Sequence, residues 1–98
     1  MMNIQAHNQK RLQTIKSFCN DYLEHKISLY DLQHSIESIN NSFENDMNQM
    51  IVNEIFLFVE ELDYINVTYE VSEQYNAVEN EIIKLDRTIN QILSDKKE

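Results

Sequence analysis

The chain has 98 residues, contains neither glycine nor proline, and carries a formal net charge of -9. Tight β-hairpins and phosphate-binding loops depend on glycine, so this composition excludes β-sandwiches, β-barrels, dinucleotide-binding domains and glycine-rich nucleotide loops. Hydrophobic residues make up 42% of the chain, which is enough for a folded core, and we expect one all-α domain.

The first predicted helix covers residues 8–24. Its apolar side chains recur every three or four residues, which is the spacing of a helix face that packs against a core. A polar break at residues 24–26 ends this helix. The apolar stripe consists of Leu12, Ile15, Cys19, Tyr22 and Leu23, with Phe18 beside it.

The second predicted helix begins at Ser28, the most clearly marked boundary in the chain. The Ser28 side chain can cap the helix, and the carboxylate of Asp31, three residues later, can accept a reciprocal hydrogen bond from the Ser28 N–H. Ile27 and Leu32 can then pack together across the cap. Turn-forming residues place the second break within 40–46. The apolar stripe between them consists of Leu29, Leu32, Ile36, Ile39 and Phe43.

The third predicted helix covers residues 46–64 and is apolar almost all round, so it is either the most buried element or has a second partner. The β-branched stretch at residues 66–69 predicts the third break, with Asn66 or Thr68 as the next cap. The main stripe consists of Met47, Met50, Ile51, Ile55, Phe58, Leu62 and Ile65, and it is widened by Val52, Phe56, Leu57 and Val59.

The fourth predicted helix covers residues 69–93 and keeps a strict four-three apolar spacing, which is typical of a helix-bundle seam. Four helices joined by short turns predict an antiparallel four-helix bundle formed by residues 1–98. We expect residues 1–7 and 95–98 to be frayed. The seam consists of Val71, Tyr75, Val78, Ile82, Leu85, Ile89 and Ile92.

The composition also indicates a compartment. Cys19 is the only cysteine, so no intramolecular disulfide can form, which suits a reducing environment. No stretch approaches the roughly 18 apolar residues of a membrane span, and the N-terminus lacks the form of a signal peptide. We expect a soluble cytoplasmic protein that does not bind membranes.

The negative charge is concentrated in the middle of the sequence. Residues 43–83 contain ten carboxylates and no lysine or arginine, whereas the segments on either side are close to neutral. Such a block argues against direct nucleic-acid binding, which needs a basic surface. It has two interpretations: a solvated surface that keeps the protein dispersed, or a face that attracts a basic partner.

The residues that could carry chemistry are few. Asp31 and His34 share one helix face, but a metal site in a bundle needs further ligands, and His7 and His25 are predicted in the N-terminal segment and a turn. Cys19 lies on an apolar stripe, where a thiol is normally inert. We therefore expect no enzyme activity, no metal and no cofactor.

Residues 15–32 resemble the opening of colicin D-type immunity proteins and related bacterial self-protection proteins. The shared features are a helix that ends in an aromatic-leucine patch, a short turn containing Lys-Ile-Ser, and a second helix with an acid near its start. Residues 60–64, ahead of a long final helix, are similar in layout. The resemblance implies a four-helix bundle whose acidic side chains occupy the tRNA-binding cleft of a cognate ribonuclease toxin.

The leading hypothesis is therefore an immunity protein, or antitoxin, that blocks a basic nuclease through an acidic surface. Tyr64 and Tyr69 flank the third break and cannot both face the core, so they are candidate anchors or packing residues of a helix end. The predicted partner-binding residues are Glu60, Glu61, Asp63, Tyr64, Tyr69, Glu70 and Glu73, with Glu44 and Asp46 as second choices.

Two alternatives remain open at this point. A phage-type inhibitor that mimics nucleic acid would use the same acidic surface against a host nuclease. A structural interaction module would instead use the heptads of residues 71–92 to form a homo-oligomer or to dock on another helix.

Overall fold

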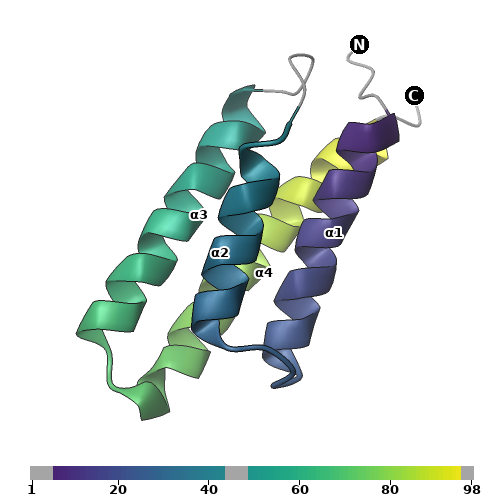
Figure 1. The fold of residues 1–98 in the computed structure, drawn as a ribbon. Helices are drawn as coiled ribbons and strands as arrows, with labels where there is room; N and C mark the ends of the chain where they lie inside the picture. Colours follow the sequence, from purple (N-terminus) through teal and green to yellow (C-terminus); the bar gives the residue numbers. More distant parts are fainter. Residues whose placement is uncertain (1–5, 44–48, 96–98) are drawn as a thin grey trace.

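The computed structural model describes residues 6–43 and 49–95. These residues form four helices, α1 (Ala6–Leu23), α2 (Leu29–Asn40), α3 (Gln49–Thr68) and α4 (Val71–Asp95). The helices run alternately up and down, so the predicted antiparallel four-helix bundle is confirmed (Figure 1). Helix α1 begins two residues before the predicted start at residue 8, and α4 extends two residues beyond the predicted end at residue 93.

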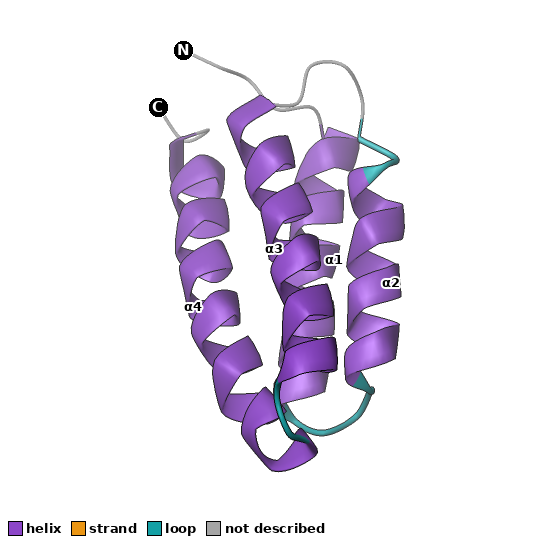
Figure 2. Cartoon of the chain, turned by 90° about the vertical axis from the view of Figure 1, so that its left-hand side faces the viewer, coloured by secondary structure: helices purple, strands orange, loops and turns teal. Residues whose placement is uncertain are grey.

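Each helix packs against two neighbours. The contacts join α1 to α2, α2 to α3, α3 to α4, and α4 back to α1, which closes the bundle into an elongated body of 43 × 20 × 20 Å (Figure 2). Two side chains of α1, Lys16 and Arg11, contact residues outside the helix. Lys16 donates to Asn90 and lies 3.6 Å from the Asp86 carboxylate, and Arg11 donates to Ser42 at 2.8 Å.

The core is built from the predicted stripes. The apolar positions spaced at three and four along all four helices point inward and are almost completely withdrawn from solvent. Phe18, Leu23, Ile39 and Phe43 pack at its margin. The buried residues are Leu12, Ile15, Cys19, Tyr22, Leu29, Leu32, Ile36, Ile51, Ile55, Phe58, Val59, Leu62, Ile65, Val78, Ile82, Leu85, Ile89 and Ile92.

In the turn between α1 and α2, a histidine stands at a position where glycine is usual. His25 adopts a left-handed conformation with φ of 63°. The Lys26 N–H donates to the Asp21 carbonyl at 2.8 Å, and the His25 N–H donates to the Tyr22 carbonyl at 3.0 Å. This is the Schellman arrangement that usually employs glycine, and histidine is among the residues that tolerate positive φ best.

The start of α2 follows the prediction closely. The Ser28 side chain accepts a hydrogen bond of 3.1 Å from the Asp31 N–H, so Ser28 is the N-cap. Ile27 and Leu32 both pack into the core, as expected of the contact across the cap. Within the described residues, the Asp31 carboxylate accepts no reciprocal hydrogen bond from the Ser28 N–H. Helix α2 ends at Asn40, inside the predicted break, and the predicted start of the third helix lies outside the described residues.

The third break is one to three residues later than predicted. Helix α3 continues through the β-branched stretch to Thr68, and the turn consists of Tyr69 and Glu70. The propensity penalty of these residues is only tenths of a kcal/mol each, roughly, so it is outweighed by tertiary packing that buries Ile65. The Gln74 side chain donates to the carbonyls of Asn66 and Tyr69, which satisfies this helix end without glycine.

Four positions of the predicted apolar stripes are exposed: Met50, Phe56, Leu57 and Val71. Val71 is 83% exposed, because the α3–α4 turn reaches beyond the α1–α2 turn at the same end of the bundle and no helix covers it (Figures 1 and 2). Met50 is also exposed, near the start of α3. Met47 lies outside the described residues.

Candidate functional site

The candidate site is a groove of about 750 Å³ between α3 and α4, called here the α3–α4 groove. Eleven side chains line it, and six of them are charged. Its carboxylates are Glu54, Glu60 and Glu61 from α3 and Glu81 from α4, and its cations are Lys84 and Arg87 from α4. Four of the ten carboxylates in the acidic block therefore converge on one surface feature.

The spacing along α3 explains why these side chains lie together. Seven residues make almost two helical turns, so residues seven apart lie on nearly the same line along a helix. Glu54 and Glu61 form one such pair, and Leu57 and Tyr64 form another beside it. The α3 wall of the groove thus contains an acidic row and an apolar row, and Glu60 lies on the other side of the apolar row.

The two walls of the groove differ in charge. On α4, the Lys84 ammonium lies 3.2 Å from the Glu81 carboxylate, one helical turn away, and Arg87 adds a second cation. On α3, Glu54, Glu60 and Glu61 form no ion pair with any residue in 6–43 or 49–95. The α3 wall is therefore negative and the α4 wall slightly positive.

Apolar side chains are exposed on α3 among these charges. Leu57 is 63% and Tyr64 is 54% exposed, and both line the groove, whose floor includes the buried Phe58 and Leu85. Phe56 is equally exposed but does not line the groove. An apolar row in water, rimmed by charges, is typical of a protein interaction surface. The exposed Phe56 and Leu57 are part of the apolar surface from which the sequence predicts a second partner for this helix.

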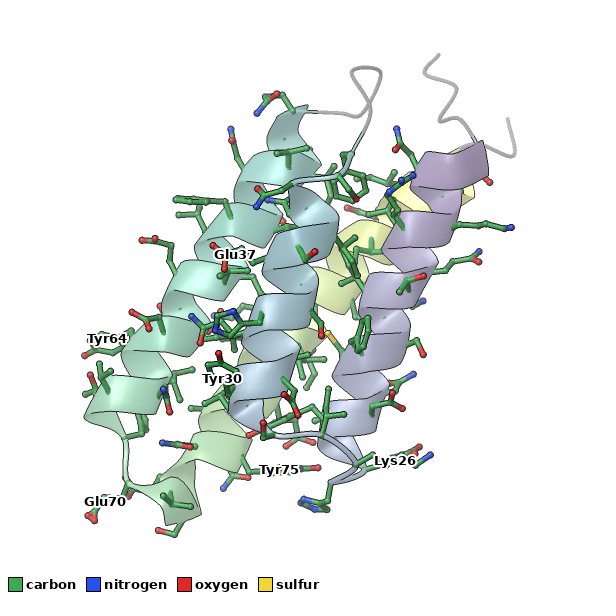
Figure 3. The ribbon with its side chains drawn as sticks, viewed as in Figure 1. Lys26, Tyr30, Glu37, Tyr64, Glu70 and Tyr75 are labelled. Atoms are coloured by element: carbon green, nitrogen blue, oxygen red, sulfur yellow. The ribbon has the colours of Figure 1, made fainter. Side chains whose placement is uncertain are left out.

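The structure brings part of the predicted site together. Glu60, Glu61 and Tyr64 line the groove, and the Tyr69 ring packs edge-on against Tyr64 with 6.4 Å between centroids. Both tyrosines are exposed, and their mutual contact at the end of α3 is consistent both with packing of a helix end and with anchors for a partner. Figure 3 shows Glu70 on the same outer edge of the α3–α4 pair as Tyr64.

Other predicted residues lie apart from the groove. Asp63, Glu70 and Glu73 are exposed, but none of them lines it. Glu44 and Asp46 lie outside the described residues. The prediction missed Glu54, Leu57 and Glu81 as lining residues. The seven-residue spacing of Glu54 from Glu61, and of Leu57 from Tyr64, is the signal that could have found two of them.

Cys19 and His34, two of the residues considered for chemistry, both lie against other side chains. Cys19 is buried, and this burial, with a smaller effect of the Asp86 carboxylate, raises the pKa of the thiol to about 12. The His34 ring packs against Tyr30 with 4.0 Å between centroids. Within the described ranges, no three His, Cys, Asp or Glu side chains are grouped so that they could hold a metal ion.

The part of the chain that the structure describes has no helix combining the length and apolar character that crossing a membrane requires. Comparison of the whole sequence with protein-family models and with curated proteins, and of the structure with solved structures, gives no match.

Proposed function

We propose that this protein is a bacterial immunity protein, or antitoxin, which binds a basic nuclease toxin through the α3–α4 groove and blocks the cleft where the toxin holds nucleic acid. The observation that carries the proposal is the α3 wall. Three carboxylates without ion pairs to described residues lie there beside two exposed apolar side chains. Such a wall offers both long-range attraction and contact area to a basic protein.

Inhibition of this kind needs no catalytic step. Carboxylates of Glu54, Glu60 and Glu61 would take the places of nucleic-acid phosphates and accept charge-assisted hydrogen bonds from lysine and arginine of the toxin. The net charge of -9 would speed the encounter with a positively charged partner. Leu57 and Tyr64 would supply the contacts that slow dissociation.

The resemblance of residues 15–32 to colicin D-type immunity proteins supports the same proposal from another part of the chain. That segment forms the end of α1, the His25 turn and the start of α2. A cytoplasmic location belongs to the proposal, because an immunity protein of this kind meets its toxin inside the cell that makes both.

The two alternatives use different surfaces or partners. The seam of α4 packs inside the chain's own core, from Val78 to Ile92, and this burial favours an inhibitor over an interaction module that uses the seam. An inhibitor that mimics nucleic acid against a host nuclease would use the same groove. The origin of the partner separates this alternative from an immunity protein.

The test is co-expression with a basic nuclease encoded beside this gene. We expect the wild-type chain to protect the host from that nuclease and the double variant Glu60→Lys/Glu61→Lys to lose protection while remaining folded. Full protection by the double variant would contradict the site. Absence of any neighbouring basic nuclease, together with inhibition of a host nuclease, would favour the mimic.

A further inference from the structure

The α3–α4 groove has an apolar centre as well as charged walls. Leu57 and Tyr64 lie along it, and Leu85 of α4 contributes to its floor. From Glu54 to Tyr64 the wall extends ten residues along α3, which corresponds to roughly 15 Å at 1.5 Å per residue. That length matches about three turns of a helix laid between α3 and α4.

We infer that the groove receives an amphipathic helix of the partner, with leucine-like side chains on one face and lysine or arginine beside them. This inference rests on the proposed function and specifies which part of a basic protein is bound. The apolar face would cover Leu57 and Tyr64, in the mode by which helices enter hydrophobic grooves. Its basic flank would face the carboxylates of Glu54 and Glu61, and the flank over Arg87 would be neutral or acidic.

Charge complementarity selects this occupant over a second copy of the chain. A copy that offered its own α3 would place carboxylates against carboxylates, and both chains carry a net charge of -9. Like charges brought together at an interface oppose association. A basic segment instead meets three acidic side chains that have no ion pair within the described part of the chain.

The probe is a pair of labelled peptides of identical composition, each of about 14 residues of leucine, lysine and alanine. One has leucines at helical spacing and lysines flanking them, and its isomer alternates leucine with polar residues, so that it has no apolar helical face. Fluorescence anisotropy at moderate salt measures the dissociation constants. We expect the helical peptide to bind at least about tenfold more tightly than its isomer.

Matched variants locate the contact. Leu57→Ser should weaken binding of the helical peptide by about tenfold and leave its isomer unchanged. Phe56→Ser, on the neighbouring exposed residue outside the groove, should change neither. Equal binding of both peptides, no binding of the helical peptide, or equal effects of the two variants would overturn the inference.

The failure of helix docking can be distinguished from that of the proposed function. If both peptides bind equally and Glu60→Lys/Glu61→Lys weakens both, the acidic surface attracts basic chains but does not select a helix. If the charge reversal affects neither peptide nor the protection assay, the acidic surface itself is the wrong assignment.

Discussion

The hydroxyl of Tyr75 donates a hydrogen bond of 2.8 Å to the backbone carbonyl of Leu23, which joins α4 to the last residue of α1. The Tyr75 ring also stacks on Tyr22 and His25, with centroid distances of 5.8 Å and 4.9 Å. Helix ends leave their last carbonyls without partners inside the helix. A side chain 52 residues further along the sequence thus completes the end of α1, beside a turn that has no glycine.

Replacement of Tyr75 by phenylalanine tests this contact. Tyr75→Phe removes the hydrogen bond and keeps the ring stack, so we expect the free energy of unfolding to fall by about 1 kcal/mol. Urea denaturation of the purified protein measures the change. The control is Tyr69→Phe, on an exposed ring, which should change stability by less than about 0.5 kcal/mol. Equal losses in the two variants would show that the Leu23 contact contributes nothing specific.

The His25 turn gives a second prediction. His25→Gly and His25→Ala both remove the ring that stacks on Tyr75, and they differ in whether a β-carbon stands at φ of 63°. We expect the glycine variant to be more stable than the alanine variant by about 1 kcal/mol, because glycine adopts positive φ without steric penalty. Thermal or urea unfolding decides the order. An alanine variant as stable as the glycine variant would mean that the turn has moved.

The N-cap of α2 is the third test. Ser28→Ala removes the acceptor for the Asp31 N–H and should destabilise the protein by about 1 kcal/mol. Ser38→Ala, at an exposed position inside the same helix, should be neutral or slightly stabilising because alanine is the better helix former. If both alanine variants behave alike in urea denaturation, Ser28 does not cap the helix in solution.

The buried Cys19 thiol predicts a dependence of stability on alkaline pH. Its pKa is raised from an ordinary value of 9.0 to about 12, so the unfolded chain releases this proton first as pH rises. The unfolded state then binds fewer protons than the native state, and stability falls by about 1.4 kcal/mol per pH unit across that window. Below pH 9.0 this contribution is constant.

Comparison with Cys19→Ala isolates the thiol. The variant loses stability at all pH values through the smaller side chain, but it lacks the thiol titration, so its stability should decline less steeply between about pH 9 and about pH 11. All other side chains are the same in both proteins, so their contribution cancels in the difference. Parallel declines of the two curves would show that Cys19 is accessible to water in the folded protein.

The sequence alone predicts most of the fold. Apolar spacing identifies which face of each helix is buried, because the 3.6-residue period links sequence directly to direction around the helix. It does not show where the ends of neighbouring helices lie relative to one another in the bundle. Val71 follows the seam spacing, but it is exposed because the α3–α4 turn reaches beyond the α1–α2 turn at that end of the bundle (Figure 1).

The candidate site could be predicted only in part. The acidic block is visible in the sequence, and it contains Glu54, Glu60, Glu61 and Glu81. Which carboxylates face one groove depends on the rotation of α3 relative to α4, which composition does not encode. Glu81 reaches the groove from another helix. Its pairing with Lys84, three residues later on the same helix, is by contrast visible in the sequence.

The salt dependence of binding to the proposed nuclease partner tests whether the α3–α4 groove is the binding site. The dissociation constant would be measured between about 50 mM and about 300 mM salt for the wild type, for Glu60→Lys/Glu61→Lys, and for Glu24→Lys/Glu37→Lys. The last variant carries the same charge change at exposed residues outside the groove. We predict that the groove variant binds at least about tenfold more weakly than the control variant, with the difference largest at low salt. Equal weakening by the two variants at every salt concentration would contradict the assignment of the groove as the binding site, since net charge alone would then explain the binding.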